Sequence, residues 1–163
     1  LLLTVLDHLI HSWDEVIEKK LKGAERAEEK LSILLEAGFE IGRDGVSYQI
    51  LVNFWGETDH NQTFRETNAD FYARYRQQII TIIEEGIQEG VFRRVDLSMA
   101  ASMILALVDG LCLQWIFDPR AFRIEKAWKA AQTFVFCHLT GYPDQSVLPR
   151  TAFQEDRLEE DGS

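Results

Sequence analysis

The sequence predicts an all-α fold of six helices. Apolar residues recur three and four positions apart along most of the chain up to residue 140, which is the period of amphipathic helices. The first proline is Pro119, and its late position favours long helices over a sandwich of short strands. The 163 residues are 46% hydrophobic and 27% charged, which is typical of a folded globular domain with its own core.

The first predicted helix spans residues 1–20, with Trp13 on its apolar face. Lysines in its last turn suit the negative end of the helix dipole, and Gly23 then breaks the pattern. A second helix is expected over about residues 25–37. The loop that is expected to follow it contains three glycines, namely Gly38, Gly42 and Gly45.

The third helix is expected to be short, at about residues 46–56, and the fourth to be long, at about residues 61–89. The fourth helix has two apolar stripes, so we expect it to lie between two layers. Gly90 follows its last turn as a C-terminal cap. Asp96 is expected to cap the N-terminus of the fifth helix, at about residues 97–118.

The sixth helix is expected over about residues 122–140, and Gly141 ends it. Together the six helices define one predicted domain, residues 1–142. Residues 143–163 contain two prolines and an acidic run, and we expect them to form a disordered tail.

The fifth helix is apolar almost all the way round, whereas an ordinary surface helix has one apolar stripe. Residues 99–117 are long enough for a membrane span, but Asp109 near the middle favours a central helix in a water-soluble bundle. One copy of the chain can hardly cover every side of this helix. We therefore expect the last two helices to pair with those of a second copy in a four-helix bundle. The residues predicted at this dimer interface are Gly110, Leu113, Phe117, Trp128, Ala131, Val135 and His138.

The formal net charge of −10 argues against nucleic-acid binding by this chain, because no basic stripe is present to hold a phosphate backbone. Residues 155–161 contribute −4 of that charge. Cys112 and Cys137 lie in apolar helical segments, as expected for buried thiols in a reducing compartment. The N-terminal segment lacks the basic region and cleavage site of a secretory signal, so we expect a cytoplasmic protein.

Three segments of the sequence resemble the effector-binding and dimerisation region of TetR-type transcriptional regulators. They are the helix ending in "IEEGIQEGVFR", the helix containing "ALVDGLCLQWIFDP" and the helix entered from "AFRIEKAW". The N-terminal "LLLTVLDHLIHSW" is similar to the connecting helix that follows the helix-turn-helix domain in that family. The resemblance covers about residues 1–140, and the "DGL…QW…DP" pattern is its most specific part.

Nothing in the chain matches the recognition helix of the family's DNA-binding domain. The resemblance therefore implies the C-terminal part of a regulator, which would contact operator DNA only through a helix-turn-helix domain missing from this sequence. It also implies a homodimer that acts as a repressor. A small-molecule effector would shift residues 1–20 and so release the operator. A pocket of aromatic and apolar residues with few polar groups suits a small apolar or aromatic effector.

The resemblance places the ligand between the connecting helix and the core helices. Asn68 stands out among the candidate residues, because it interrupts an apolar stripe. Packing within the core is the alternative for every candidate, with a backbone carbonyl as the partner of Asn68. The predicted ligand-binding residues are Trp13, Tyr48, Phe54, Trp55, Asn68, Phe71, Tyr72, Tyr75, Met103, Leu107 and Gln114.

A possible metal site has a plainer explanation. The residues Asp7, His8, His11 and Glu15 have helical spacing that could hold a divalent ion, but a solvated charged face explains them equally well. We therefore expect no metal.

Catalysis finds no support in the sequence. Asp109 could act as an acid, but a buried hydrogen-bonded carboxylate that fixes the helix register, within the chain or across a dimer, explains it better. Cys137 and His138 are adjacent on a helix and point about 100° apart, which excludes a dyad. No phosphate-binding loop or cofactor motif is present, so we expect neither an enzyme nor a cofactor. A helical enzyme or cofactor-binding bundle, and a dimeric protein-interaction scaffold, are the alternatives.

Overall fold

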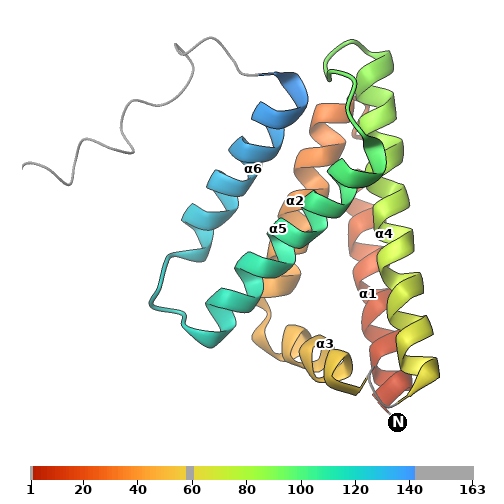
Figure 1. The fold of residues 1–163 in the computed structure, drawn as a ribbon, viewed down its shortest axis with the longest axis vertical. Helices are drawn as coiled ribbons and strands as arrows, with labels where there is room; N and C mark the ends of the chain where they lie inside the picture. The colour runs from red at the N-terminus through yellow and green to blue at the C-terminus, as the bar shows by residue number, and fades with distance from the viewer. Residues whose placement is uncertain (1, 58–60, 142–163) are drawn as a thin grey trace, which may run out of the picture.

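The computed structural model describes residues 2–57 and 61–141, which fold into six α-helices (Figure 1). The helices are α1 (Leu2–Leu21), α2 (Ala27–Arg43), α3 (Gly45–Glu57), α4 (Gln62–Gln88), α5 (Leu97–Phe117) and α6 (Ile124–Thr140). No strand occurs within these described residues, and the all-α prediction is confirmed. The expected disordered tail, residues 143–163, lies outside the described part of the chain.

Helix α2 is central and packs against each of the other five helices. In Figure 1, α4 and α1 run side by side along one edge, α5 crosses in front of α2, and α6 forms the opposite edge. Helix α3 lies across the lower end, where it contacts α1, α2 and α4. Helices α1, α2, α4 and α5 therefore surround a common interior.

The second helix is longer than predicted, because the expected glycine loop does not form there. Gly38 and Gly42 lie inside α2, and Gly45 begins α3. A β-carbon at Gly38 would lie 3.1 Å from the Cγ1 atom of Val108, and one at Gly42 would overlap the side chain of Cys112. The two helical glycines thus let α5 approach the backbone of α2, a packing role that the sequence pattern does not distinguish from a turn.

The predicted ends of α4 and α5 are confirmed. Gly90 follows α4 with a φ of +76°, a left-handed conformation that glycine adopts without steric cost. The Oδ1 atom of Asp96 accepts a hydrogen bond from the backbone N–H of Met99 at 2.9 Å. Asn61 caps α4 in the same manner and accepts from the backbone N–H of Thr63 at 2.9 Å.

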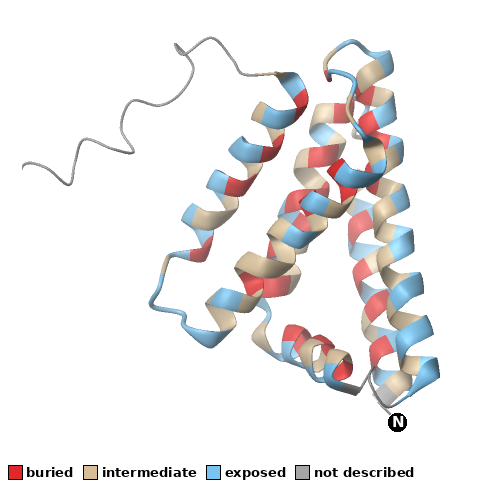
Figure 2. Ribbon diagram, viewed as in Figure 1, coloured by how far each residue is buried: buried red, intermediate tan, exposed pale blue. Residues whose placement is uncertain are grey.

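Two groups of buried side chains form the core (Figure 2). One group joins α2, α4 and α5 and includes Leu31, Ile83 and Ala101. The other joins α1, α3 and α5 and includes Leu6 and Phe54. Residues from both groups line a single cavity, so the two halves of the core meet at that cavity.

Helix α5 keeps much of its apolar surface uncovered within one chain. Met99 is 58% exposed, Met103 is 48% exposed, and Phe134 of α6, which adjoins Met103, is 60% exposed. Among the described residues, α5 is also the one helix whose length and composition would suit a membrane span, a test that core helices of soluble proteins pass as well. A second copy of the chain remains the predicted cover for this face.

Candidate functional site

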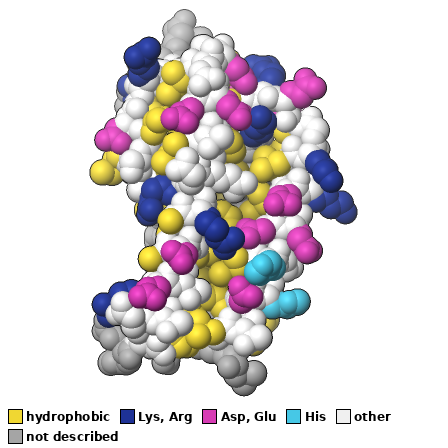
Figure 3. Space-filling view, turned by 90° about the vertical axis from the view of Figure 1, so that its right-hand side faces the viewer, with side chains coloured by type: hydrophobic (Ala, Val, Ile, Leu, Met, Phe, Trp, Pro, Cys, Tyr) yellow, Lys and Arg dark blue, Asp and Glu magenta, His cyan; other side chains and the backbone are white. Residues whose placement is uncertain are grey.

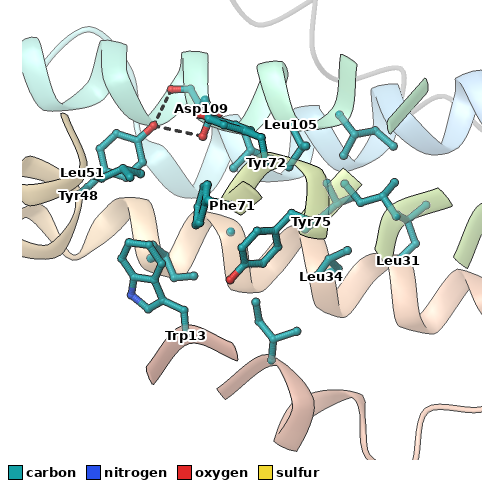
Figure 4. Close-up of a pocket in the computed structure, with 17 residues that line it drawn as sticks. Trp13, Leu31, Leu34, Tyr48, Leu51, Phe71, Tyr72, Tyr75, Leu105 and Asp109 are labelled. Carbon is teal, nitrogen blue, oxygen red and sulfur yellow. Dashed lines mark hydrogen bonds between the residues drawn. The ribbon is translucent and has the colours of Figure 1, made fainter. Parts of the chain in front are cut away.

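A cavity of about 80 Å³ lies between α1, α2, α4 and α5, with part of its wall supplied by α3 (Figure 4). Its surface is almost entirely apolar. By the volume that one water occupies, it has room for roughly five to eight water-sized groups. The lining residues are Trp13, Ile17, Leu31, Leu34, Leu35, Gly38, Ile41, Tyr48, Leu51, Phe71, Tyr72, Tyr75, Ile79, Ile104, Leu105, Val108 and Asp109.

Helix α4 supplies the aromatic part of the wall, because Phe71, Tyr72 and Tyr75 lie on its inward side. The centroid of the Phe71 ring lies 5.3 Å from that of Tyr72 and 4.9 Å from that of Tyr75. Trp13 of α1 meets Phe71 edge-on, with 6.3 Å between the ring centroids. Aromatic faces carry partial negative charge, so a wall of this kind attracts cations as well as apolar groups.

Asp109 of α5 is the one charged side chain among the residues that line the cavity. Its Oδ2 atom accepts a hydrogen bond from the hydroxyl of Tyr72 at 2.6 Å. The hydroxyl of Tyr48 lies 3.1 Å from the carbonyl oxygen of Asp109 and 3.4 Å from its Oδ1 atom (Figure 4). The carboxylate is therefore hydrogen-bonded within its own chain, to α3 and α4, which is the plainer of the two interpretations predicted for Asp109.

The electrostatics of this cluster follow from its burial. Loss of water raises the pKa of the Asp109 carboxyl, against the hydrogen bonds from Tyr72 and Tyr48, which lower it. Burial and the nearby carboxyl also raise the pKa of both phenols, which therefore stay protonated and act as donors. The cavity thus contains one carboxyl whose negative charge is costly without a positive partner.

Five of the predicted ligand-binding residues line this cavity, namely Trp13, Tyr48, Phe71, Tyr72 and Tyr75. Phe54, Trp55 and Asn68 lie outside its wall. Phe54 is completely buried and packs against Phe64, with 4.7 Å between the ring centroids. The Oδ1 atom of Asn68 accepts a hydrogen bond from Nε1 of Trp55 at 3.1 Å, so these two predicted residues contact each other.

Met103, Leu107 and Gln114 also lie outside the cavity, on the other side of α5. Met103 and Leu107 line a groove between α5 and α6, and Gln114 donates to the carbonyl oxygen of Gly110 in its own helix. A helix wheel separates Asp109 from these three residues, but only packing decides which side of α5 faces the cavity. The sequence signal that could have identified Asp109 as a lining residue is its isolation in an apolar helix.

The residues predicted at the dimer interface differ in how far their own chain buries them. Ala131 and Val135 are each 3% exposed, because α6 uses this side to cover its own chain, so they offer no surface to a partner. Phe117 is 74% exposed, and a β-carbon at Gly110 would meet nothing within its own chain. Leu113 and Trp128 are partly buried, and His138 is exposed.

The described residues contain no group of three or more side chains placed to hold a metal ion. In the candidate metal set of α1, Nδ1 of His11 donates to the carbonyl oxygen of Asp7 at 2.8 Å. At the end of α6, His138 contacts Arg93, whose Nε atom donates to the carbonyl oxygen of His138 at 2.6 Å.

The fold and cavity together define a helical ligand-binding domain with an uncovered apolar face. Residues 27–138 match the family model of the BetI-type transcriptional repressor, C-terminal region. The chain therefore belongs to this family of TetR-type regulators, in agreement with the resemblance of its sequence. No curated protein matches the chain.

Solved structures of transcriptional regulators share this fold. One is a candidate regulator from Saccharomonospora viridis in complex with choline, with a TM-score of 0.77 and 26% identity over 85% of this chain and 72% of that chain. Another is a TetR regulator from Haloarcula marismortui, with a TM-score of 0.76 and 20% identity over 83% of this chain and 75% of that one. The family and these neighbours are regulators rather than enzymes.

Proposed function

We propose that this chain is the effector-sensing and dimerising region of a cytoplasmic TetR-type repressor, with the effector bound in the cavity between α1, α2, α4 and α5. The observation that carries this proposal is the aromatic cavity with one carboxyl, part of whose wall is α1. In the family resemblance, α1 is the helix that connects to a helix-turn-helix domain. Operator DNA would be held by that domain.

The effector that best suits this cavity is a small organic cation with apolar substituents. The rings of Trp13, Phe71 and Tyr72 offer aromatic faces to a positive charge, and Asp109 offers an opposite charge. The choline in the structure from Saccharomonospora viridis has this chemistry, since it is a quaternary ammonium alcohol. This proposal replaces the broader expectation of an apolar or aromatic effector.

The size of the cavity supports a mechanism based on helix movement. At about 80 Å³, the cavity is smaller than the roughly 300–1,000 Å³ of typical ligand pockets. An effector larger than a trimethylammonium head would therefore fit only if the surrounding helices separate. Binding energy would then favour an arrangement with α1 displaced, and about 1.4 kcal/mol of preference changes operator affinity tenfold.

The proposed dimer uses the apolar face of α5 and α6. Met99, Met103, Phe117 and Phe134 are exposed there, and a second copy of the same face would cover them in a four-helix bundle. Two effector sites and two copies of α1 would then be connected through one shared interface.

The test compares choline with 3,3-dimethylbutan-1-ol, which has the same shape but carbon in place of the charged nitrogen. Isothermal titration calorimetry on the chain should show choline binding, with the neutral alcohol weaker by about tenfold or more, given the strength of cation–π contacts in a desolvated site. Equal affinity for both would show that the site selects shape and not charge. Absence of choline binding would overturn the proposed effector class.

A further inference from the structure

Two polar contacts from α4 converge on a single carboxylate of α1. The hydroxyl of Tyr75 donates to the Oδ1 atom of Asp14 at 2.8 Å. The Nη1 atom of Arg74 donates to the Oδ2 atom of the same carboxylate at 2.9 Å. Charge-assisted hydrogen bonds of this kind are stronger than neutral ones. Asp14 thus attaches the middle of α1 to α4.

Tyr75 also belongs to the cavity wall. Its ring lines the cavity together with Phe71 and with Trp13, the residue next to Asp14 on α1. On its other side, Tyr75 lines a polar cleft that contains Asp14 and Arg74. Figure 4 shows the Tyr75 hydroxyl directed toward α1 and away from Asp109. Figure 3 shows the face formed by α1 and α4, where hydrophobic side chains lie in a seam between charged ones. The Tyr75 side chain therefore lies between the cavity and the Asp14 contact that holds α1 on α4.

The attachment of α1 differs between its two ends. Near its C-terminus, Nζ of Lys20 contacts the Oε2 atom of Glu40 on α2 at 2.5 Å, and α2 packs along α1. Asp14 lies almost two turns closer to the N-terminus. Release of the Asp14 contact alone would leave the C-terminal end of α1 held on α2. Leu6 and Ile10 in the N-terminal half of α1 are buried in the core group shared with α3, so this half would stay packed on α3 while its contact with α4 loosens.

We propose that Tyr75 and Asp14 form a latch that couples occupancy of the cavity to the position of α1. This inference rests on the proposed function, because it assigns the step by which a bound effector reaches the connecting helix. An occupant that displaces the Tyr75 ring moves its hydroxyl away from Asp14. The carboxylate then keeps only the exposed Arg74 contact, and the N-terminal half of α1 loosens from α4.

Hydrogen exchange of the whole chain, followed by mass spectrometry, tests the latch. Tyr75→Phe removes the hydroxyl and keeps the ring, and Tyr72→Phe is a matched control on the same helix and cavity. Without any ligand, amides of α1 around Asp14 should exchange about tenfold faster in Tyr75→Phe than in the parent chain. The control should retain the parent exchange in α1, because the Tyr72 hydroxyl contacts Asp109 on α5 instead.

The second arm adds choline as the probe. In the parent chain, choline should raise exchange in α1, whereas Tyr75→Phe should bind choline without a further change there. Parent-like exchange in α1 of ligand-free Tyr75→Phe would overturn the latch, even if choline binds. Failure of the parent chain to bind choline would overturn the proposed effector class, and the ligand-free comparison would still decide the latch. Asp14→Ala leaves the cavity wall intact and should reproduce the effect of Tyr75→Phe, so a folding defect in either variant does not remove the test.

Discussion

Tyr72 and Tyr75, three residues apart on α4, direct their hydroxyls to carboxylates on two different helices. Tyr72 donates to Asp109 of α5 at 2.6 Å, and Tyr75 donates to Asp14 of α1 at 2.8 Å. Both rings line the same cavity. A single stretch of α4 therefore connects the cavity to α5 on one side and to α1 on the other.

The first prediction concerns the charge of Asp109. Asp109→Asn keeps the shape of the side chain but removes the countercharge, so choline affinity should fall about tenfold to a hundredfold. Calorimetric titration measures this change, and affinity for 3,3-dimethylbutan-1-ol should change little. Asp118→Asn, at the exposed end of the same helix, serves as the control and should leave both affinities unchanged. Unaltered choline binding by Asp109→Asn would remove Asp109 from the site.

The second prediction is a dependence of choline affinity on pH. Burial raises the pKa of Asp109, and choline favours the ionised carboxylate. Choline affinity should therefore be highest above the raised pKa of Asp109 and should decline as the pH falls through that pKa. Titrations over a pH series measure the profile, and Asp109→Asn should flatten this part of it. Parallel profiles for the two proteins would contradict the assignment.

The third prediction concerns the stability of the ligand-free chain, which should depend on pH in the opposite direction to choline affinity because of the same raised pKa of Asp109. Without ligand, the folded chain holds the Asp109 proton at a higher pH than the unfolded chain does. The contribution of Asp109 to stability should therefore increase as the pH falls from above the raised pKa toward the ordinary value of about 3.9. Urea unfolding at each pH measures this contribution as the difference in free energy of unfolding between the parent chain and Asp109→Asn. A difference that does not vary across this window would show that Asp109 titrates normally.

The fourth prediction tests the close contact of α2 and α5. Gly42→Ala places a β-carbon where the Cys112 side chain lies, and should lower the free energy of unfolding by about 1–3 kcal/mol. Gly56→Ala is the matched control, because its β-carbon would meet nothing and alanine favours a helix by up to about 1 kcal/mol. Urea denaturation compares the two variants. If Gly42→Ala is as stable as the control, the two helices are not closely packed at this point.

The fifth prediction concerns the proposed dimer. A β-carbon at Gly110 meets nothing within its own chain, so Gly110→Leu should fold normally and yet weaken the dimer. Native mass spectrometry gives the mass of the assembly and also detects any bound small molecule. Gly56→Leu, equally open but on α3, should leave the assembly intact. A dimer that persists in Gly110→Leu would place Gly110 outside the interface.

Much of the fold follows from local patterns in the sequence. The spacing of apolar residues predicts all six helices, and Asp96 and Gly90 mark where α5 begins and α4 ends. The prediction fails at Gly38 and Gly42, since a glycine that ends a helix and one that admits a neighbouring helix look alike in one sequence. The difference depends on Val108 and Cys112, which are distant in the chain.

The candidate site was less predictable for the same reason. Periodicity places Phe71, Tyr72 and Tyr75 on one side of α4, and all three line the cavity. It does not determine which side of an apolar helix faces a cavity. Met103 was predicted to bind ligand but lies in the groove between α5 and α6, whereas Asp109, which was not among the predicted ligand-binding residues, lines the cavity.

By itself, the sequence determined the helix content, the family and the aromatic character of the α4 residues that line the cavity. Each of these depends on spacing along the chain, which local physics converts directly into helical faces. The tertiary structure alone decided that Asp109 points into the cavity and that Tyr75 reaches Asp14 across to α1. Both relationships require the rotation and separation of packed helices, which arise from side-chain contacts between distant segments and not from the period of any one helix.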